Sequence, residues 1–203
     1  MRGKRVFITG GNSGIGLVTA SELAKRGAEI VLACKPSKKT DLAVSSLNSL
    51  SSLPVINLEV DLASLDSVRN LAARFLEKFD SLDVLINNAG IFPPKQKFTE
   101  DGFEMQFGVN HLAHFLLTNL LLDCLERNSP SRVITVSSML HKKGEIAFES
   151  FRGYEKYVSS VAYNNSKLCN VLFALELADR KAGSGVTSNV LHPGAVSTDI
   201  VRD

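Results

Sequence analysis

The stretch "TGGNSGIG", residues 9–16, decides the fold class, because it joins an apolar run to a segment of helical period. Its glycines follow a GxxxGxG spacing. Glycines between a strand and a helix permit a tight turn and let backbone amides approach a pyrophosphate. The alternative is a purely structural loop, since glycine also serves turns and close helix packing. The loop positions expected to contact a dinucleotide are Gly10, Asn12, Ser13, Gly14, Ile15 and Gly16.

Short β-rich runs alternate with longer segments of helical period along the rest of the chain. The expected strands are residues 5–9, 29–34, 55–60, 83–87, 132–137 and 186–192. The expected helices cover roughly residues 14–26, 38–50, 64–79, 101–127 and 158–182. Alternation of this kind is typical of βαβ units with right-handed crossovers. It predicts an α/β fold, a doubly wound parallel sheet of the Rossmann type with helices on both faces.

The composition indicates one ordinary globular domain. At 203 residues the chain suffices for one core and is short for two, so a single domain over residues 1–203 is expected. The charges nearly balance, with 23 basic and 21 acidic residues and no basic stripe, which speaks against a nucleic-acid partner. The longest apolar stretch, residues 115–125, is too short to cross a bilayer, so no transmembrane segment is expected.

The cysteines and histidines give no sign of a metal site. Three cysteines are present, an odd number, and no two have CxxC spacing, so neither a disulfide framework nor a zinc site is indicated, and a reducing, cytoplasmic compartment fits best. His111 and His114 lie three residues apart, but without a third ligand nearby we favour packed imidazoles over a metal.

The second expected strand ends in "LACKPSKK", residues 32–39, where an NAD enzyme would carry an acidic residue that holds the ribose hydroxyls. Cys34 and Lys35 stand there instead. No carboxylate repels a 2′-phosphate, and Lys35 and Lys38 could form charge-assisted contacts to one, so NADP(H) is favoured over NAD(H). The alternative is that both lysines belong to a solvated loop.

A tyrosine and a lysine stand four residues apart in "AYNNSKLCN", residues 162–170. On a helix this spacing places Tyr163 and Lys167 on one face. A lysine ammonium beside a phenol favours the phenolate, so Lys167 is expected to lower the pKa of Tyr163 and make it a proton donor and acceptor. The alternative is a chance pair on a helix surface.

Seven motifs follow one another in a definite order along the chain. They are "TGGNSGIG", Asp61 in "VDLAS", "NNAG" at 87–90, Asn110 in "GVNHLAHF", "VSS" at 136–138, the Tyr163–Lys167 pair and "HPGAVST" at 192–198. Their order resembles that of short-chain dehydrogenases/reductases over the whole chain. Longer phrases such as "AYNNSKLCNVLF" resemble the retinol dehydrogenase branch, which also includes the WW-domain-containing oxidoreductase.

The resemblance implies a role for each matching position. Tyr163 would protonate the carbonyl oxygen of the substrate, and Ser138 would donate a hydrogen bond to the same oxygen. Lys167 would lower the pKa of Tyr163 and hold the nicotinamide ribose. Asn110 would hold a water for proton relay. The alternatives are that Asn110 only bridges backbone groups within a long helix and that Ser138 only caps a strand. Beyond the glycine loop, the expected cofactor contacts are Lys35, Asp61, Leu62, Asn88, Ala89, Gly90, Tyr163, Lys167, Pro193, Gly194 and Thr198.

The resemblance also implies a strand order of 3-2-1-4-5-6, with the family's usual seventh strand and C-terminal substrate-covering segment missing. The implied reaction is NADP(H)-dependent hydride transfer with a carbonyl or alcohol of a lipophilic substrate, of the retinoid, steroid or aldehyde class. The alternative is a non-catalytic NAD(P)-binding or interaction protein. A homodimer through the helices at 101–127 and 158–182, and peripheral association with intracellular membranes, are further expectations.

Overall fold

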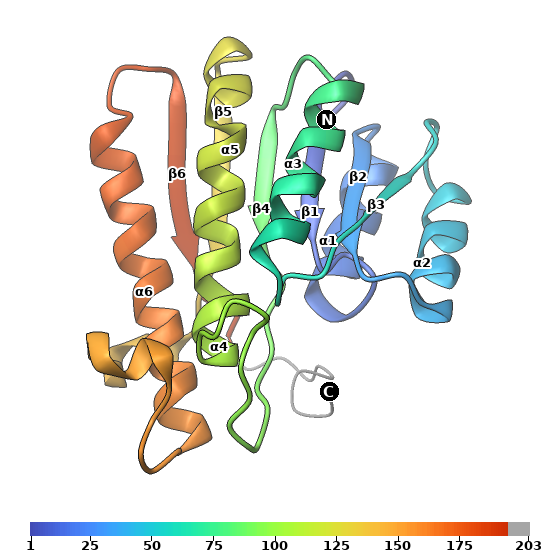
Figure 1. The fold of residues 1–203 in the computed structure, drawn as a ribbon. Helices are drawn as coiled ribbons and strands as arrows, with labels where there is room; N and C mark the ends of the chain where they lie inside the picture. The colour runs from blue at the N-terminus through green and yellow to red at the C-terminus, as the bar shows by residue number, and fades with distance from the viewer. Residues whose placement is uncertain (195–203) are drawn as a thin grey trace.

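Six parallel strands form one sheet in the computed structural model, which describes residues 1–194. The strand order is β3-β2-β1-β4-β5-β6, which confirms the predicted order (Figure 1). Every predicted strand is present, with ends that differ by at most one residue from those expected. The strands are β1 (Arg5–Thr9), β2 (Glu29–Cys34), β3 (Ile56–Glu59), β4 (Val84–Asn87), β5 (Ser131–Val136) and β6 (Val186–Leu191).

Helices connect successive strands and cover both faces of the sheet. In Figure 1, α3, α5 and α6 lie in front of the sheet and α1 lies behind it. Ser37 and Ser64 begin α2 and α3 by accepting hydrogen bonds from the amides of Thr40 and Ser67. The long helices are α1 (Gly14–Lys25), α2 (Lys38–Asn48), α3 (Leu65–Lys78), α5 (Ala113–Arg127) and α6 (Ser159–Arg180). Within residues 1–194, none of the helices is both long and apolar enough to cross a membrane.

The helix expected at 101–127 is wrong in its start and in its continuity. It begins with α4 (Met105–Phe107), passes through a π-helical turn, η1 (Gly108–Leu112), and only then continues as α5. Glu104 forms an isolated antiparallel bridge with Phe98 and accepts a hydrogen bond from the amide of Phe107, so it is the N-cap residue rather than part of the helix. The irregular stretch at 141–157 overlaps two short 3-10 helices, η2 (Met139–Lys143) and η3 (Phe148–Arg152).

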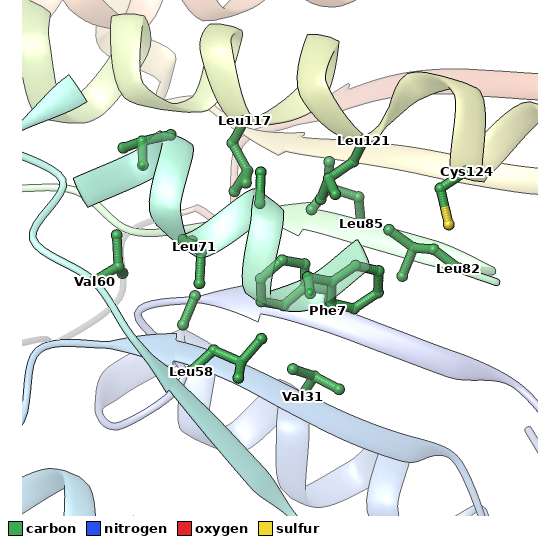
Figure 2. Packing of buried hydrophobic residues seen from close by; sticks show 14 of the residues in the cluster. Phe7, Val31, Leu58, Val60, Leu71, Leu82, Leu85, Leu117, Leu121 and Cys124 are labelled. Atoms are coloured by element: carbon green, nitrogen blue, oxygen red, sulfur yellow. The ribbon is translucent and has the colours of Figure 1, made fainter. Parts of the chain in front are cut away.

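Two hydrophobic cores lie on opposite sides of the sheet, because successive strand side chains point to opposite faces. The larger one packs Phe7 and Leu85 against α3 and α5, with Leu117 and Leu121 descending from α5 (Figure 2). The rings of Phe7 and Phe75 stack with centroids 4.8 Å apart. The smaller core packs strand residues including Ile8, Ile30 and Leu32 against α1 and α2. Both cores hold the strand ends of β1, β2 and β4 rigidly in place.

The order of the strands reverses at β1, which pairs with β2 on one side and with β4 on the other. At such a switch point the loops after neighbouring strands diverge and leave a crevice at the carboxyl ends of the strands. The predicted motifs after β1, β2 and β4 meet there.

Candidate active site

A cavity of about 370 Å³ opens at the carboxyl ends of the strands. All the positions between Gly10 and Gly90 for which we predicted a cofactor contact line it. These are Gly10, Asn12, Ser13, Gly14, Ile15, Gly16, Lys35, Asp61, Leu62, Asn88, Ala89 and Gly90. The sequence reasoning missed seven other lining residues: Ala33, Cys34, Val60, Ala63, Ile91, Met105 and Val109. Four of these seven residues are next to a predicted cofactor contact in the sequence, and Ala33 is two positions from one. Met105 and Val109 have no such neighbour, because they come from α4 and η1.

The glycine loop forms a cradle that side chains would fill. Gly10 and Gly14 have φ of 65° and 51°, in the left-handed region that favours glycine. A Cβ on Gly16 would lie 2.3 Å from the carbonyl oxygen of Gly10, so only glycine fits there. Ser13, the N-cap residue of α1, makes no side-chain capping bond to the helix. The loop therefore fits the close approach of a pyrophosphate to the start of α1.

The "NNAG" turn after β4 is tied directly to the glycine loop. The side-chain amide of Asn88 donates to the carbonyl oxygens of Thr9, at 2.8 Å, and of Gly10, at 3.3 Å. The hydroxyl of Thr9 accepts hydrogen bonds from the backbone amides of Asn88 and Ala89, each at 3.0 Å. Adjacent pairing of β1 and β4 makes these contacts possible, and they fix two walls of the cavity relative to each other.

Lys35 and Asp61 form an ion pair at the far end of the cavity, with Nζ and Oδ2 2.7 Å apart. Their side chains remain 63% and 39% exposed, so the pair is accessible to solvent. We expected separate roles for these two residues, whereas the structure places them in contact because β2 and β3 are neighbours. Beside them, burial raises the pKa of the Cys34 thiol to about 11, so Cys34 lines the cavity as a neutral group.

Lys167 is buried on α6, with 2% of its surface exposed. Its ammonium donates to the carbonyl oxygen of Val136 at 3.1 Å and lies 5.5 Å from the centroid of the Tyr163 ring. The predicted shared helix face is therefore confirmed. Burial lowers the pKa of Lys167 to about 8, because the protein interior disfavours the charged form.

The predicted lowering of the pKa of Tyr163 by Lys167 is wrong for this structure. Burial raises the pKa of Tyr163, and a hydrogen bond between the side chains of Ser138 and Tyr163 opposes that shift. The ring of Phe92 packs edge-on against Tyr163, with centroids 4.9 Å apart. Tyr163 is therefore a neutral phenol held between an aromatic ring and a serine.

Ser138 and Asn110 both make structural contacts, but not those weighed as alternatives: Ser138 caps η2 rather than a strand, and Asn110 bonds groups outside its own helix. Ser138 begins η2, and its hydroxyl accepts a hydrogen bond from the amide of Leu140 at 3.3 Å. Asn110 is fully buried on the π turn. Its side chain accepts from the amide of Ile91 at 2.8 Å and donates to the carbonyl of Ile91 and the hydroxyl of Ser166, both at 3.1 Å. Asn110 thus links the cavity wall at Ile91 to Ser166 on α6.

Both helical histidines are packed imidazoles. His111 contacts the side chain of Asn170 at 3.2 Å, and His114 lies buried between Thr9 and Asn110. Burial lowers the pKa of each to about 4, so both rings are neutral near pH 7. In the part of the chain that the structure describes, no three potential ligands gather that could hold a metal ion.

Of the remaining predicted contacts, Tyr163 and Lys167 lie on α6 and do not line the cavity, and the other three lie after β6. Pro193 and Gly194 are not among the residues that line the cavity, and the amide of Gly194 donates to Nδ1 of His192 at 3.2 Å. Thr198 lies outside the described residues.

Comparison with known proteins gives consistent matches along the chain. The family model for short chain dehydrogenases matches residues 4–203. Retinol dehydrogenase 14 of Mus musculus is 48% identical over 213 residues, which cover 100% of this chain and 64% of that protein. Retinol dehydrogenase 13 of Homo sapiens is 50% identical over 202 residues, covering 98% and 61%. The chain thus spans less than two thirds of the length of these relatives.

Solved structures share the same architecture. An uncharacterised protein from Mycobacterium paratuberculosis is 43% identical and superposes with a TM-score of 0.84, covering 95% of this chain and 69% of that one. A short chain dehydrogenase from Burkholderia cenocepacia in complex with NADP is 28% identical, with a TM-score of 0.81 and coverage of 98% and 77%. The RhlG/NADP complex from Pseudomonas aeruginosa is 25% identical, with a TM-score of 0.81 and coverage of 100% and 75%.

Proposed function

Because the chain belongs to the short chain dehydrogenase family, we propose that it is an oxidoreductase that interconverts alcohol and carbonyl groups with NADP(H). One arrangement carries the proposal: the buried Lys167 lies against Tyr163, whose ring packs on Phe92 next to a cavity that fits a dinucleotide. Phe92, which contacts Tyr163, follows directly after the cavity residue Ile91. The acid/base group and the cofactor cradle are therefore joined by one short segment.

The cavity residues would hold the cofactor along the carboxyl edge of the sheet. The glycine loop would take the pyrophosphate, Asp61 and Leu62 the adenine end, and Asn88, Ala89 and Gly90 the ribose nearer the nicotinamide. Pro193, Gly194 and Thr198 are proposed near the carboxamide. When bound, the nicotinamide supplies or accepts two electrons as a hydride.

The side chains on α6 and η2 would handle the proton. In the reducing direction, the Tyr163 hydroxyl donates its proton to the substrate oxygen, on which negative charge develops. Ser138 donates a hydrogen bond to the same oxygen and stabilises that charge. Lys167 is proposed to hold the nicotinamide ribose, and Asn110 is proposed to hold a water that returns the proton to Tyr163.

A preference for NADP(H) over NAD(H) is part of the proposal. The end of β2 carries Lys35 and no carboxylate of its own, and Lys38 begins the following helix. The similar proteins from Burkholderia cenocepacia and Pseudomonas aeruginosa are described as NADP complexes. Lys35 would contact the 2′-phosphate by exchanging its partner Asp61 for the phosphate oxygens.

The proposed substrate is a lipophilic alcohol or carbonyl compound of the retinoid, steroid or aldehyde class, since two curated relatives of 48% and 50% identity are named retinol dehydrogenases. We further propose a cytoplasmic protein that can associate peripherally with intracellular membranes, and the three cysteines are all unpaired, as in a reducing compartment. A homodimer could form through α5 and α6, on which Phe115, Leu172 and Leu175 are exposed.

The experiment that tests this function combines a binding titration with a turnover assay. NADPH fluorescence should report saturable binding, and all-trans-retinal or an aliphatic aldehyde should then be reduced with matching loss of NADPH absorbance. Saturable binding without any turnover would favour the alternative, a non-catalytic NAD(P)-binding or interaction protein. Absence of binding to both NADPH and NADH would reject the enzyme and the NAD(P)-binding protein, and would favour an interaction protein.

A further inference from the structure

His114 occupies the centre of a buried hydrogen-bond chain that begins at the cavity wall. Its Nε2 lies 2.8 Å from the hydroxyl oxygen of Thr9, a residue 105 positions away in the sequence. Its Nδ1 lies 3.1 Å from the carbonyl oxygen of Asn110, on the π turn. Thr9, Asn110 and His114 are all at most 1% exposed, so water cannot replace any of these partners.

The partners of His114 determine where its single proton sits. A carbonyl oxygen can only accept, so Nδ1 of the neutral ring must carry the hydrogen that it donates to Asn110. Nε2 is then an acceptor, and the Thr9 hydroxyl must donate to it. The other available acceptor for this hydroxyl, the carbonyl of Ile86, is 3.5 Å away and therefore a poorer partner.

With this assignment, the Thr9 oxygen keeps two lone pairs that can accept hydrogen bonds. Two backbone amides donate to it, so every lone pair has a donor. The amides of Asn88 and Ala89 donate to that oxygen at 3.0 Å each. With the opposite tautomer or a charged ring, Nε2 would itself donate to Thr9, and one of these amides would lose its acceptor. Only one protonation state of His114 therefore satisfies every donor in this part of the wall.

We propose that His114 is a positioning residue of the cofactor site, holding Asn88 and Ala89 in place through the hydroxyl of Thr9. The same helical segment fixes the far end of the wall, because Asn110 binds both backbone groups of Ile91. The segment 88–91 is thus held at both ends from one π turn and the start of α5. This role rests on the proposed function, since it concerns the wall that would face the bound cofactor.

Two substitutions separate the contacts of His114. In Asn the amide stands at the same number of bonds from the backbone as Nδ1, and in Gln it stands where Nε2 does. His114→Asn should therefore keep the contact with Asn110 and lose that with Thr9, whereas His114→Gln should keep an acceptor for Thr9. His111→Asn is the matched control, because His111 is a buried imidazole on the same helical segment that contacts Asn170 and neither Thr9 nor the wall.

The measurements are NADPH affinity by fluorescence titration and amide hydrogen exchange of Asn88 and Ala89. His114→Asn should weaken NADPH binding about tenfold, the effect of one buried hydrogen bond left unmade. It should also speed exchange of both amides about tenfold, while amides in α3 exchange as before. His114→Gln should stay within about threefold of wild type in both measurements, and so should His111→Asn. In the Thr9→Val background, His114→Asn should add nothing further.

Nitrogen NMR of the wild-type chain provides a readout that needs no variant. The ring of His114 should show a protonated Nδ1 and an unprotonated Nε2 near pH 7. The opposite tautomer would overturn the inference, as would equal NADPH affinity and equal exchange in wild type and His114→Asn. If the wild-type chain bound neither NADPH nor NADH, the proposed function itself would fail and this role with it. Binding by the wild type therefore distinguishes the two failures.

Discussion

Lys167 is held in a setting that disfavours its own charge. Burial lowers its pKa from 10.5 in the unfolded chain to about 8 in the folded one. Between these two values the unfolded chain binds more protons, so this residue makes stability rise with pH. Below about pH 8, Lys167 is charged in both the folded and the unfolded chain. Burial of the ammonium then lowers the free energy of unfolding by its full amount.

The effect of Lys167 on the free energy of unfolding can be measured against a variant that lacks the charge. The free energy of unfolding of wild type minus that of Lys167→Met should increase between pH 8 and 10, by at most about 3 kcal/mol. Tyr163 acts in the opposite sense at higher pH, because its pKa is raised, so the comparison should stop near pH 10. Urea unfolding at each pH measures the difference. A difference that falls or stays level over this window would mean that Lys167 is not desolvated.

The Lys35–Asp61 pair gives a second prediction at the same scale. Asp61→Asn keeps Oδ1, which accepts from the amide of Ala63, but removes the charge that competes for Lys35. The preference for NADPH over NADH should rise by up to about fivefold, the range of an exposed ion pair. Any loss of adenine contacts affects both nucleotides and cancels in the ratio of dissociation constants.

Lys35→Gln is the reciprocal control, and it should lower the same ratio. An Asp61→Asn variant with an unchanged or smaller preference would show that the ion pair does not limit recognition of the 2′-phosphate. The relevant measurement is a pair of titrations, with NADPH and NADH, at one ionic strength, because screening weakens such contacts.

At the scale of elements, the π turn at Gly108–Leu112 sets the position of Asn110 and of α5. Gly108 makes the close approach of this turn possible, since a Cβ there would lie 2.3 Å from Cγ2 of Thr99. Thr99 is buried and β-branched, so its methyl cannot rotate away cheaply.

Gly108→Ala should therefore lower the free energy of unfolding by about 1–3 kcal/mol, the usual cost of overpacking. Thr99→Ser removes the obstructing methyl but keeps the hydroxyl that accepts from the amide of Phe103. In that background Gly108→Ala should cost much less. Equal losses in both backgrounds, measured by chemical denaturation, would show that the methyl is not the obstacle.

The elements themselves were predictable where a pattern is local. Alternation of apolar runs and helical periods located every strand to within one residue, and Gly10, Gly14 and Gly16 marked the start of α1. The helix expected at 101–127 begins later because Glu104 pairs with Phe98 in the short bridge before α4. Hydrophobic period does not distinguish an α-helix from a π turn, so the register shift before Asn110 was invisible.

At the scale of the whole molecule, the contacts that shape the site join residues far apart in the sequence. Lys35 meets Asp61 only because β2 and β3 are neighbours, and His114 meets Thr9 only because the fold brings the start of α5 to the end of β1. Motif order identified twelve of the residues that line the cavity, but not these partners. The raised pKa of Tyr163 likewise depends on burial, which no local pattern reports.

If this fold brings a dinucleotide cavity and a proton-donating Tyr163 into one site, turnover must depend on the Tyr163 hydroxyl. Tyr163→Phe removes that hydroxyl. Tyr154→Phe is the matched control, because it loses only a hydroxyl that accepts from Asn165. Reduction of retinal or an aldehyde by NADPH should fall about 100- to 10,000-fold in Tyr163→Phe and stay near wild type in Tyr154→Phe. NADPH should still bind to Tyr163→Phe. Turnover that survives in Tyr163→Phe, or a wild-type chain that binds NADPH without turnover, would contradict the account.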